Sequence, residues 1–351
     1  MKAEEDVSDT DHYKQLEQDS CHYFGNHETH EPVGGEVDLH KIYVTCKKNP
    51  DHAQFIPIHK FSLQHLPDSY RNNDLYEYIK AVADLTVLIN VKKTSPHRPQ
   101  FWPKTSHPYP FFKAIENEKE EEIAIAKTKV KTGSGMVYNV SKFENGARQH
   151  GGRQGRSYTV CWCKQCELLD SPSTIWFEFD VYTATHVVFD EIEANHTSLR
   201  LFQDSERSPK VLIDKVRIHD ALVEYDRCWI KCVTCQVSVG VPLEQMWTKY
   251  LALDKQVTKQ YTKSRDMDKL TFVVSHPHGC PKHVSVGRWN NIRAIGESKS
   301  IKRITYSTGT CPGSSGANVH CIGYTGGKYR QLAHSGSLPD GSNTSGAGWV
   351  K

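Results

Sequence analysis

Short runs of β-branched and aromatic residues, separated by Gly, Pro and Asn turns, fill the chain from about residue 129 to its end. Examples are GSGMVYNV, TIWFEFDVYTATHVVF, KVLIDKVRIH, CWIKCVTCQVSV and KLTFVVSH. Runs of this kind predict about ten to twelve short strands, a spacing typical of an all-β sandwich or of paired barrels. Residues 241–261 have helical composition instead, and they predict a helix that is an insertion or lies between domains.

The residues before this strand-rich part divide into three segments. Residues 1–35 are polar and acidic with little periodicity, so we expect them to be disordered. Residues 36–92 contain one amphipathic helix that runs into an apolar strand, which predicts a small, partly helical α/β region. Residues 93–128 are rich in proline and then in charge, and they predict an extended linker. Residues 129–351 form the last predicted domain.

Composition excludes several classes of protein. The chain has 351 residues, of which 37% are hydrophobic and 24% charged, enough apolar surface for a core. No apolar run approaches the roughly 18 residues of a spanning helix, and the N-terminus has no hydrophobic stretch typical of a secretory signal. We therefore expect an intracellular protein with no membrane partner. A net charge of +3 is too small to indicate nucleic-acid binding, and no sequence feature sets an oligomeric state.

Three short segments carry residues suited to nucleophilic acyl chemistry. His186 ends a strand in TATHVV, Asp226 lies at the mouth of another strand, and Ser315 lies inside the loop CPGSSGA. Such chemistry needs a serine activated by a histidine base and an acid that fixes the tautomer of that base. It also needs backbone N–H donors, which glycine-flanked loops supply because glycine permits the required dihedral angles. The order His, Asp, Ser favours one shared site.

This order and these phrases resemble the chymotrypsin-like serine proteases, over roughly residues 129–351. TATHVV, GTCPGSSGANV and the opening GSGMVYNV match the pattern of that family, and residues 274–287 are similar to the strand–turn–strand that precedes the nucleophile loop in its bacterial and viral members. The resemblance implies an all-β fold with a double six-stranded antiparallel β-barrel. It also implies a serine endopeptidase that hydrolyses protein or peptide substrates through an acyl-enzyme, with no cofactor for catalysis.

The resemblance assigns roles residue by residue. Ser315 would be the nucleophile and His186 the general base, with Asp226 orienting His186. The backbone N–H groups of Gly313 and Ser315 would form the oxyanion hole. Three other acids compete with Asp226 for the orienting role, but they lie too close to His186 in sequence or in the strand region before Asp226: Asp190, Asp214 and Asp220.

One departure from the family pattern concerns activation. Position 314 is Ser, where secreted digestive members carry an aspartate that captures a newly freed N-terminus. Activation by N-terminal cleavage of that kind is therefore not expected.

The resemblance also implies a substrate pocket. Residues 308–311 hold no carboxylate, so cleavage after Lys or Arg is not expected. Glutamyl-specific bacterial and glutamine-specific viral members carry a histidine on the strand after the nucleophile, and His334, followed by Ser335 and Gly336, is similar in position. An imidazole there donates a hydrogen bond to a carbonyl or carboxylate, which predicts a preference for Glu or Gln before the scissile bond. The alternative is that His334 only packs under the strand.

Two CxxC pairs suggest a metal. Cys163 and Cys166 form the first, and Cys232 and Cys235 form the second. Four thiolates suit the tetrahedral coordination of a structural zinc ion. The alternatives are buried free thiols, or disulfides if the compartment is oxidising. A further His/Cys group is interpreted as a strand–turn and not as a metal site: His276, His278, Cys280 and His283.

A rival interpretation of the whole chain is an inactive pseudoprotease that acts as a zinc-stabilised interaction module. The complete set of His, Asp and Ser counts against it, because an inactive relative would be free to lose one of them.

Overall fold

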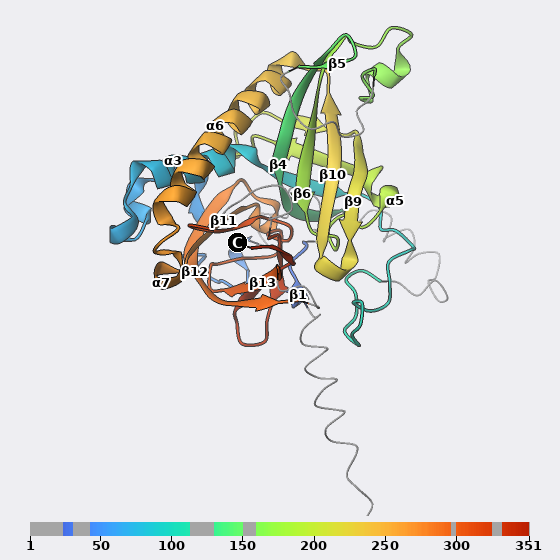
Figure 1. Ribbon diagram of the computed structural model, residues 1–351. Coiled ribbons are helices and arrows are strands. Elements are labelled where there is room, and N and C mark those ends of the chain that lie inside the picture. Colours follow the sequence, from blue (N-terminus) through green and yellow to red (C-terminus); the bar gives the residue numbers. More distant parts are fainter. Residues whose placement is uncertain are drawn as a thin grey trace, which may run out of the picture.

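The computed structural model describes residues 24–30, 43–112, 130–149, 159–295, 300–324 and 332–350. They form two antiparallel sheets, seen one above the other in Figure 1. The expectation of an all-β chain built on two antiparallel sheets is confirmed. The sheets have eight and nine strands, more than the six expected in each, because short strands pair at their edges and off their main path.

The eight-stranded sheet has the order β8-β7-β3-β4-β6-β10-β9, with β5 paired to β4. Its strands are β3 (Thr86–Val91), β4 (Lys131–Glu144), β5 (Ala147–Arg148), β6 (Ile175–Thr183), β7 (Thr197–Leu201), β8 (Val211–Ile213), β9 (Val216–Leu222) and β10 (Arg227–Thr234). Strands β4 and β6 are buried along nearly their whole length, so both faces of the sheet centre are covered.

The nine-stranded sheet has the order β1-β15-β16-β13-β12-β11-β14, with β17 paired to β13 and β2 to β12. Its strands are β1 (Asn26–His27), β2 (Ile56–Pro57), β11 (Leu270–Ser275), β12 (His283–Ala294), β13 (Ile301–Tyr306), β14 (Val319–Cys321), β15 (His334–Ser337), β16 (Asn343–Ser345) and β17 (Gly348–Trp349). The first two of these strands come from the N-terminal part of the chain.

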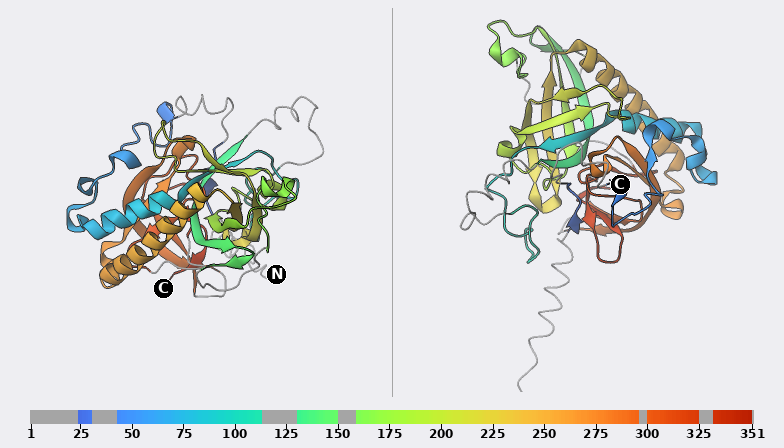
Figure 2. Two further views of the ribbon diagram at one scale, coloured as in Figure 1. Left: turned by 90° about the horizontal axis from the view of Figure 1, so that it is seen from above. Right: turned by 180° about the vertical axis from the view of Figure 1, so that it is seen from behind.

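Two long helices pack side by side across the sheets (Figures 1 and 2). Helix α3 (Asn73–Leu85) is capped by Asn72, whose side chain accepts hydrogen bonds from the backbone N–H groups of Asp74 and Leu75, as expected of an N-cap. Helix α6 (Val237–Tyr261) connects the two sheets, so the helix expected over 241–261 is present. The Tyr78 hydroxyl of α3 donates to Asp254 of α6 at 2.9 Å, and the largest apolar core joins both helices to both sheets.

Other helices with bounds in the described residues are short: α5 (Glu191–Ala194), α7 (Arg265–Asp268) and the 3-10 turns η1 (Ile58–Lys60), η2 (Leu63–His65), η3 (Asp68–Tyr70), η4 (Cys166–Leu168), η5 (Val223–Tyr225) and η6 (Pro277–Gly279). Among the described residues, no helix combines the length and apolar character needed to cross a membrane.

The domain division drawn from the sequence remains a proposal, and three observations bear on it. Strand β3, assigned to the N-terminal region, pairs with both β4 and β7. Residues of the expected linker are buried, among them Arg98 and Trp102. Residues 24–30, within the segment expected to be disordered, include β1; residues 1–23 and 31–35 lie outside the described residues. We therefore propose that the strand-rich unit begins at Thr86 and is completed by earlier segments.

Candidate active site

The three residues singled out as a catalytic set meet in space. His186 follows β6, Asp226 immediately precedes β10, and Ser315 lies in the loop between β13 and β14. His186 Nδ1 is 2.8 Å from Asp226 Oδ2, and His186 Nε2 is 2.7 Å from Ser315 Oγ. All three are fully buried. A carboxylate only accepts hydrogen bonds, so Nδ1–H donates to Asp226 and leaves Nε2 free to accept from the Ser315 hydroxyl.

Asp226 is held by four donors. It sits in the left-handed region with φ 47°, a conformation Asp tolerates better than most residues, at the end of η5. Its carboxylate accepts from the Thr185 hydroxyl at 2.9 Å, from the His186 backbone N–H at 3.1 Å, from the His186 ring and from the Ser335 hydroxyl. Burial would raise the pKa of Asp226, but the charge and hydrogen bonds of His186 and Ser335 bring it below its ordinary value. The carboxylate therefore stays ionised at neutral pH.

The competing acids have other partners. Asp190 accepts from the Glu193 backbone N–H at 3.0 Å as the cap of α5. Asp214 pairs with Lys164 and Asp220 with Arg227 near the surface.

The loop that carries Ser315 is fixed by the GSG segment of β4. Ser134 donates its backbone N–H to Ser315 O at 2.7 Å and its hydroxyl to Gly313 O at 2.8 Å. A Cβ on Gly133 would lie 2.9 Å from Ser315 O, so the close approach of the two segments requires glycine. Gly313 itself has φ +99°, and a Cβ there would lie 2.4 Å from His276 O.

The Gly313 backbone N–H points at a carbonyl oxygen. It donates to Glu28 O at 2.5 Å, while the Glu28 N–H donates to Ser315 Oγ at 3.0 Å. Gly313 is thus placed to bind an oxygen next to the Ser315 hydroxyl. The role of the Ser315 N–H as a second oxyanion donor stays a prediction.

Strand β15 carries the predicted pocket residues. Gly336 pairs with His27 of β1, and the Ser335 hydroxyl donates to Asp226. His334 is buried and is bonded through both ring nitrogens: Nδ1 is 2.6 Å from the Tyr306 hydroxyl, and Nε2 is 2.7 Å from Glu28 Oε2.

Sequence reasoning missed a lysine close to the predicted pocket residues. Lys48 Nζ contacts the Glu28 carboxylate and donates to Thr310 Oγ1 at 2.9 Å, to Asn343 Oδ1 at 2.9 Å and to Ser337 Oγ at 2.6 Å. It comes from a Lys-Lys pair with no local pattern, more than 250 positions before Thr310, Ser337 and Asn343, so no sequence signal pointed to it.

A buried ion cluster supports the histidine turn and was also missed. Glu193 accepts from Arg98 Nε at 2.7 Å and from Lys131 Nζ at 3.0 Å. Arg98 also donates to the His186 backbone carbonyl at 3.1 Å. Burial would raise the pKa of Glu193, but the hydrogen bonds and charges of Arg98 and Lys131 lower it to about 2.

The cysteines require one correction. The group that could hold a metal consists of Cys161, Cys163, Cys166 and Cys235; Cys232 is not part of it. Successive side chains of a strand point to opposite faces, and Cys232 of β10 points into the main core, whereas its neighbour Val233 packs with the cysteine group.

The predicted strand–turn is present as β11, η6 and the start of β12, and its four His and Cys residues do not form one metal-binding group. The ring of His276 bonds Cys280 O and that of His283 bonds Pro281 O, both contacts internal to the turn. His278 instead joins residues from two other segments.

Two solved structures that this chain matches are distant from it in sequence. No family model and no curated protein matches the chain. Among solved structures, the HtrA-type protease AlgW with a tripeptide matches at 10% identity and a TM-score of 0.37, over 78% of this chain and 59% of AlgW. The active form of the Rv3671c protease from M. tuberculosis matches at 10% identity and a TM-score of 0.37, over 77% of this chain and 78% of that one. The chain thus spans about three fifths of AlgW, and its function has to be argued from its own site.

Proposed function

We propose that this chain is a serine endopeptidase. The observation that carries the proposal is the continuous hydrogen-bonded line from Asp226 through both ring nitrogens of His186 to Ser315 Oγ. The three side chains are buried, and their hydrogen bonds run in the direction that lets His186 accept the serine proton. Together with the nearby Gly313 N–H, they would supply the nucleophile, the base, the orienting acid and an oxyanion donor in one place.

In the proposed reaction, Ser315 Oγ attacks the carbonyl carbon before the scissile bond while its proton passes to His186 Nε2. Asp226 stabilises the resulting imidazolium, and the Gly313 N–H binds the oxyanion. The C–N bond then breaks as His186 returns the proton to the leaving amine. Water, deprotonated by the same histidine, hydrolyses the acyl-enzyme and regenerates Ser315.

We further propose that the residue before the scissile bond is glutamate. Glu28 of the same chain already fills the pocket: its carboxylate contacts Lys48, the Ser337 hydroxyl at 2.6 Å and His334. Burial keeps the pKa of Tyr306 well above its ordinary value, so its hydroxyl stays protonated and donates to His334 Nδ1. Nε2 then carries the hydrogen offered to the substrate carboxylate. The lysine charge favours Glu over the neutral Gln and disfavours Lys and Arg.

We also propose that Cys161, Cys163, Cys166 and Cys235 bind a structural zinc ion. Their sulfurs lie within 4.8 Å of one another, and Cys163 Sγ is 3.5 Å from Cys235 Sγ. Cys235 follows the last residue of β10, whereas Asp226 precedes the first. The cysteine group therefore ties the loop after residue 159 to the end of β10 remote from the triad, and it has no part in the chemistry.

An active-site serine probe tests the endopeptidase proposal. A fluorophosphonate is expected to label wild-type protein at Ser315 and to leave Ser315→Ala unlabelled, and a peptide library is expected to be cut after Glu. A chain that stays unlabelled and cuts nothing would instead be the inactive interaction module.

A further inference from the structure

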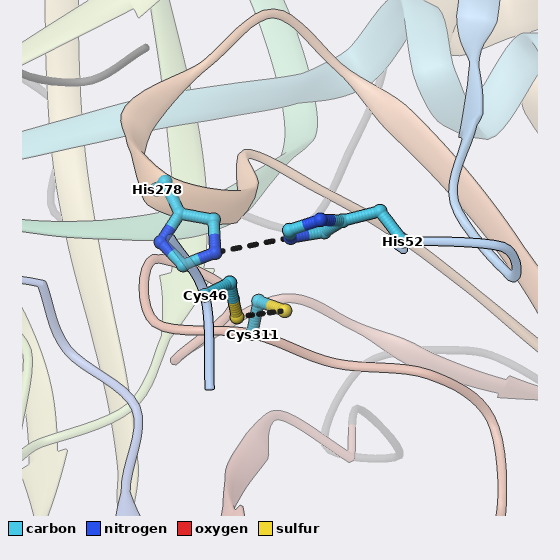
Figure 3. A group of neighbouring side chains, drawn as sticks. All are labelled: Cys46, His52, His278 and Cys311. Atoms are coloured by element: carbon cyan, nitrogen blue, oxygen red, sulfur yellow. Dashed lines mark hydrogen bonds between the residues drawn. The ribbon is translucent and has the colours of Figure 1, made fainter. Parts of the chain in front are cut away.

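A second group of metal-binding side chains lies beside the nucleophile loop. Cys46 and His52 come from the N-terminal part, His278 from η6, and Cys311 from the start of the loop that carries Ser315. Figure 3 shows the four side chains pointing toward one another. All four are buried, and their donor atoms lie within 4.8 Å of each other.

The distances fit tetrahedral zinc. With Zn–S of about 2.3 Å and Zn–N of about 2.0–2.1 Å, a tetrahedral site places two sulfurs about 3.8 Å apart and two nitrogens about 3.3 Å apart. Here Cys46 Sγ and Cys311 Sγ are 3.6 Å apart, and His52 Nε2 and His278 Nε2 are 3.2 Å apart.

The two cysteine sulfurs also accept hydrogen bonds from one residue. The Asn49 backbone N–H donates to Cys46 Sγ at 3.4 Å, and the Asn49 side-chain amide donates to Cys311 Sγ at 3.1 Å. Such second contacts orient metal ligands and stabilise their charge. The His52 ring stacks on Tyr43 with centroids 3.8 Å apart, which holds it in place.

We propose that Cys46, His52, His278 and Cys311 bind a zinc ion that builds the substrate pocket. The two N-terminal ligands bracket Lys48, and Cys311 lies four positions before Ser315. The ion would fasten the segment that supplies the pocket lysine to the loop that supplies the nucleophile. Its role is positioning, because all four coordination positions are taken by protein.

Metal content of the purified full-length protein tests this site. Native mass spectrometry is expected to find two zinc ions in the wild type, one in Cys46→Ser and one in Cys163→Ser. Cys280→Ser, a matched change two positions from His278, should keep two. In cobalt-substituted protein, the absorption that remains in Cys163→Ser should be that of an S₂N₂ site.

The outcomes decide between this site and the cysteine cluster. A wild type with a single ion that Cys163→Ser removes would overturn the proposal without the need for any folded Cys46 variant. A Cys46–Cys311 disulfide found in place of metal would also overturn it.

A different observation concerns residues 24–30, which cross the site as a substrate would. On one side, Asn26 and His27 pair antiparallel with Ser337 and Gly336 of β15. On the other side, the backbone of His30 exchanges two hydrogen bonds with Thr132, at 2.9 and 2.7 Å. The segment thus bridges both sheets with Glu28 between them.

Glu28 stands in the register of the residue to be cleaved. Its carbonyl oxygen receives the Gly313 N–H, its amide nitrogen is 3.0 Å from Ser315 Oγ, and its side chain fills the pocket of Lys48 and His334. A strand with a purely structural role needs none of these three coincidences. We infer that Glu28–Thr29 is an internal substrate bond, which the chain cleaves by itself; this inference rests on the proposed function.

The step balances with the groups present. Ser315 Oγ bonds to the Glu28 carbonyl carbon and its proton goes to His186. The Glu28–Thr29 bond then breaks and His186 protonates the freed Thr29 nitrogen, and water releases Glu28 as a carboxylate. No aspartate stands at position 314 to capture the new N-terminus, so the effect of cleavage is to unblock the cleft.

Intact mass and N-terminal sequencing of the full chain test the inference. The wild type is expected to yield a chain beginning at Thr29, whereas Ser315→Ala stays intact. Glu28→Lys should also stay intact, because the new side chain meets Lys48, and yet label with the fluorophosphonate at least as fast as the wild type. Glu31→Lys, a matched acid three positions later, should be cleaved like the wild type.

The possible failures are distinguishable. Wild-type protein that labels and cuts external Glu peptides but keeps residues 1–28 overturns self-cleavage and leaves the endopeptidase proposal standing. Self-cleavage is likewise overturned if the wild type is intact and only Glu28→Lys labels, which would make the segment an inhibitor and not a substrate. Absence of labelling in both the wild type and Glu28→Lys removes the proposed function and the inference with it.

Discussion

His334 and Glu28 are joined by a 2.7 Å contact between Nε2 and Oε2, although 306 positions separate them in the chain. The contact links the wall of the proposed pocket to a residue from the N-terminal part. It gives a physical basis for the proposed recognition of an acidic residue, since a buried imidazole that has lost its carboxylate partner is left with an unpaired donor.

Loss of either Ser315 or His186 should abolish catalysis. We expect Ser315→Ala and His186→Ala each to lower kcat on the order of 10⁶-fold, and the double variant to lose no more, because both remove the same activated nucleophile. Steady-state cleavage of a Glu-containing peptide measures this. Ser307→Ala changes an exposed serine nearby and should behave as wild type. Additive losses would contradict a shared unit.

The pocket lysine should set the choice between Glu and Gln. Lys48→Ala removes a charged partner of the substrate carboxylate, so kcat/KM for Glu peptides is expected to fall roughly 10- to 100-fold while that for Gln peptides changes little. His334→Ala should weaken both. The exposed neighbour gives a control, Lys47→Ala, which should preserve the ratio. An unchanged Glu/Gln ratio in Lys48→Ala would remove the lysine from the pocket argument.

The buried Glu193 cluster should make stability depend on pH. Glu193→Gln leaves Arg98 and Lys131 buried without their anion, which is expected to cost about 3–5 kcal/mol in the free energy of unfolding at pH 7. The folded pKa of about 2 lies below the ordinary value of 4.5, so this stabilisation is present above about pH 4.5 and is lost as the pH falls toward 2.

Urea unfolding at several pH values measures that difference. The gap between wild type and Glu193→Gln should narrow from about pH 4.5 downward. The exposed Glu224→Gln is the control and should stay within about 0.5 kcal/mol of the wild type. A gap that stays constant with pH would show that Glu193 is not an ionised partner.

Experiments on the cysteine cluster can decide whether Cys161 or Cys232 is the zinc ligand. Cys161→Ser is expected to lose the zinc ion of this cluster and to lower the melting temperature, because metal-binding free energy contributes to folding. Cys232→Ser should keep the ion, whatever it costs in core packing. Metal analysis and thermal unfolding distinguish the two effects, and loss of zinc in Cys232→Ser would restore the assignment made from spacing.

The sequence allowed predictions where a residue's position depends on a local backbone conformation, such as a turn or a glycine-flanked loop. The turn after β6, the residue before β10 and the glycine-flanked loop each have a recognisable phrase, so the residues that meet at the triad could be predicted. The GSG of β4 likewise marks a close approach of two segments, here to Ser315.

Prediction failed where the partners come from segments without such phrases. Arg98 and Glu193 are ordinary charged residues until the fold buries them together. Lys48 likewise gains its partners only when the fold brings Glu28 and Thr310 beside it. Cys232 was predicted as a zinc ligand because both cysteines of a CxxC pair were expected to bind the same ion. The alternation of side chains along β10 instead places Cys232 on the face of the sheet opposite the cysteine group. The spacing of Cys46 and His52 does not by itself indicate a metal site, which becomes apparent only when the fold places His278 and Cys311 beside them.

The contribution of early segments to both sheets has a practical consequence. Strands β1 and β2 and the pocket lysine all precede residue 60, and β3 precedes residue 92. A fragment cut at residue 129 would hold the whole triad but lack an inner strand and the cation of its pocket. We expect such a fragment to fold poorly and to lack activity. Any search for a minimal catalytic unit should therefore begin upstream of Cys46.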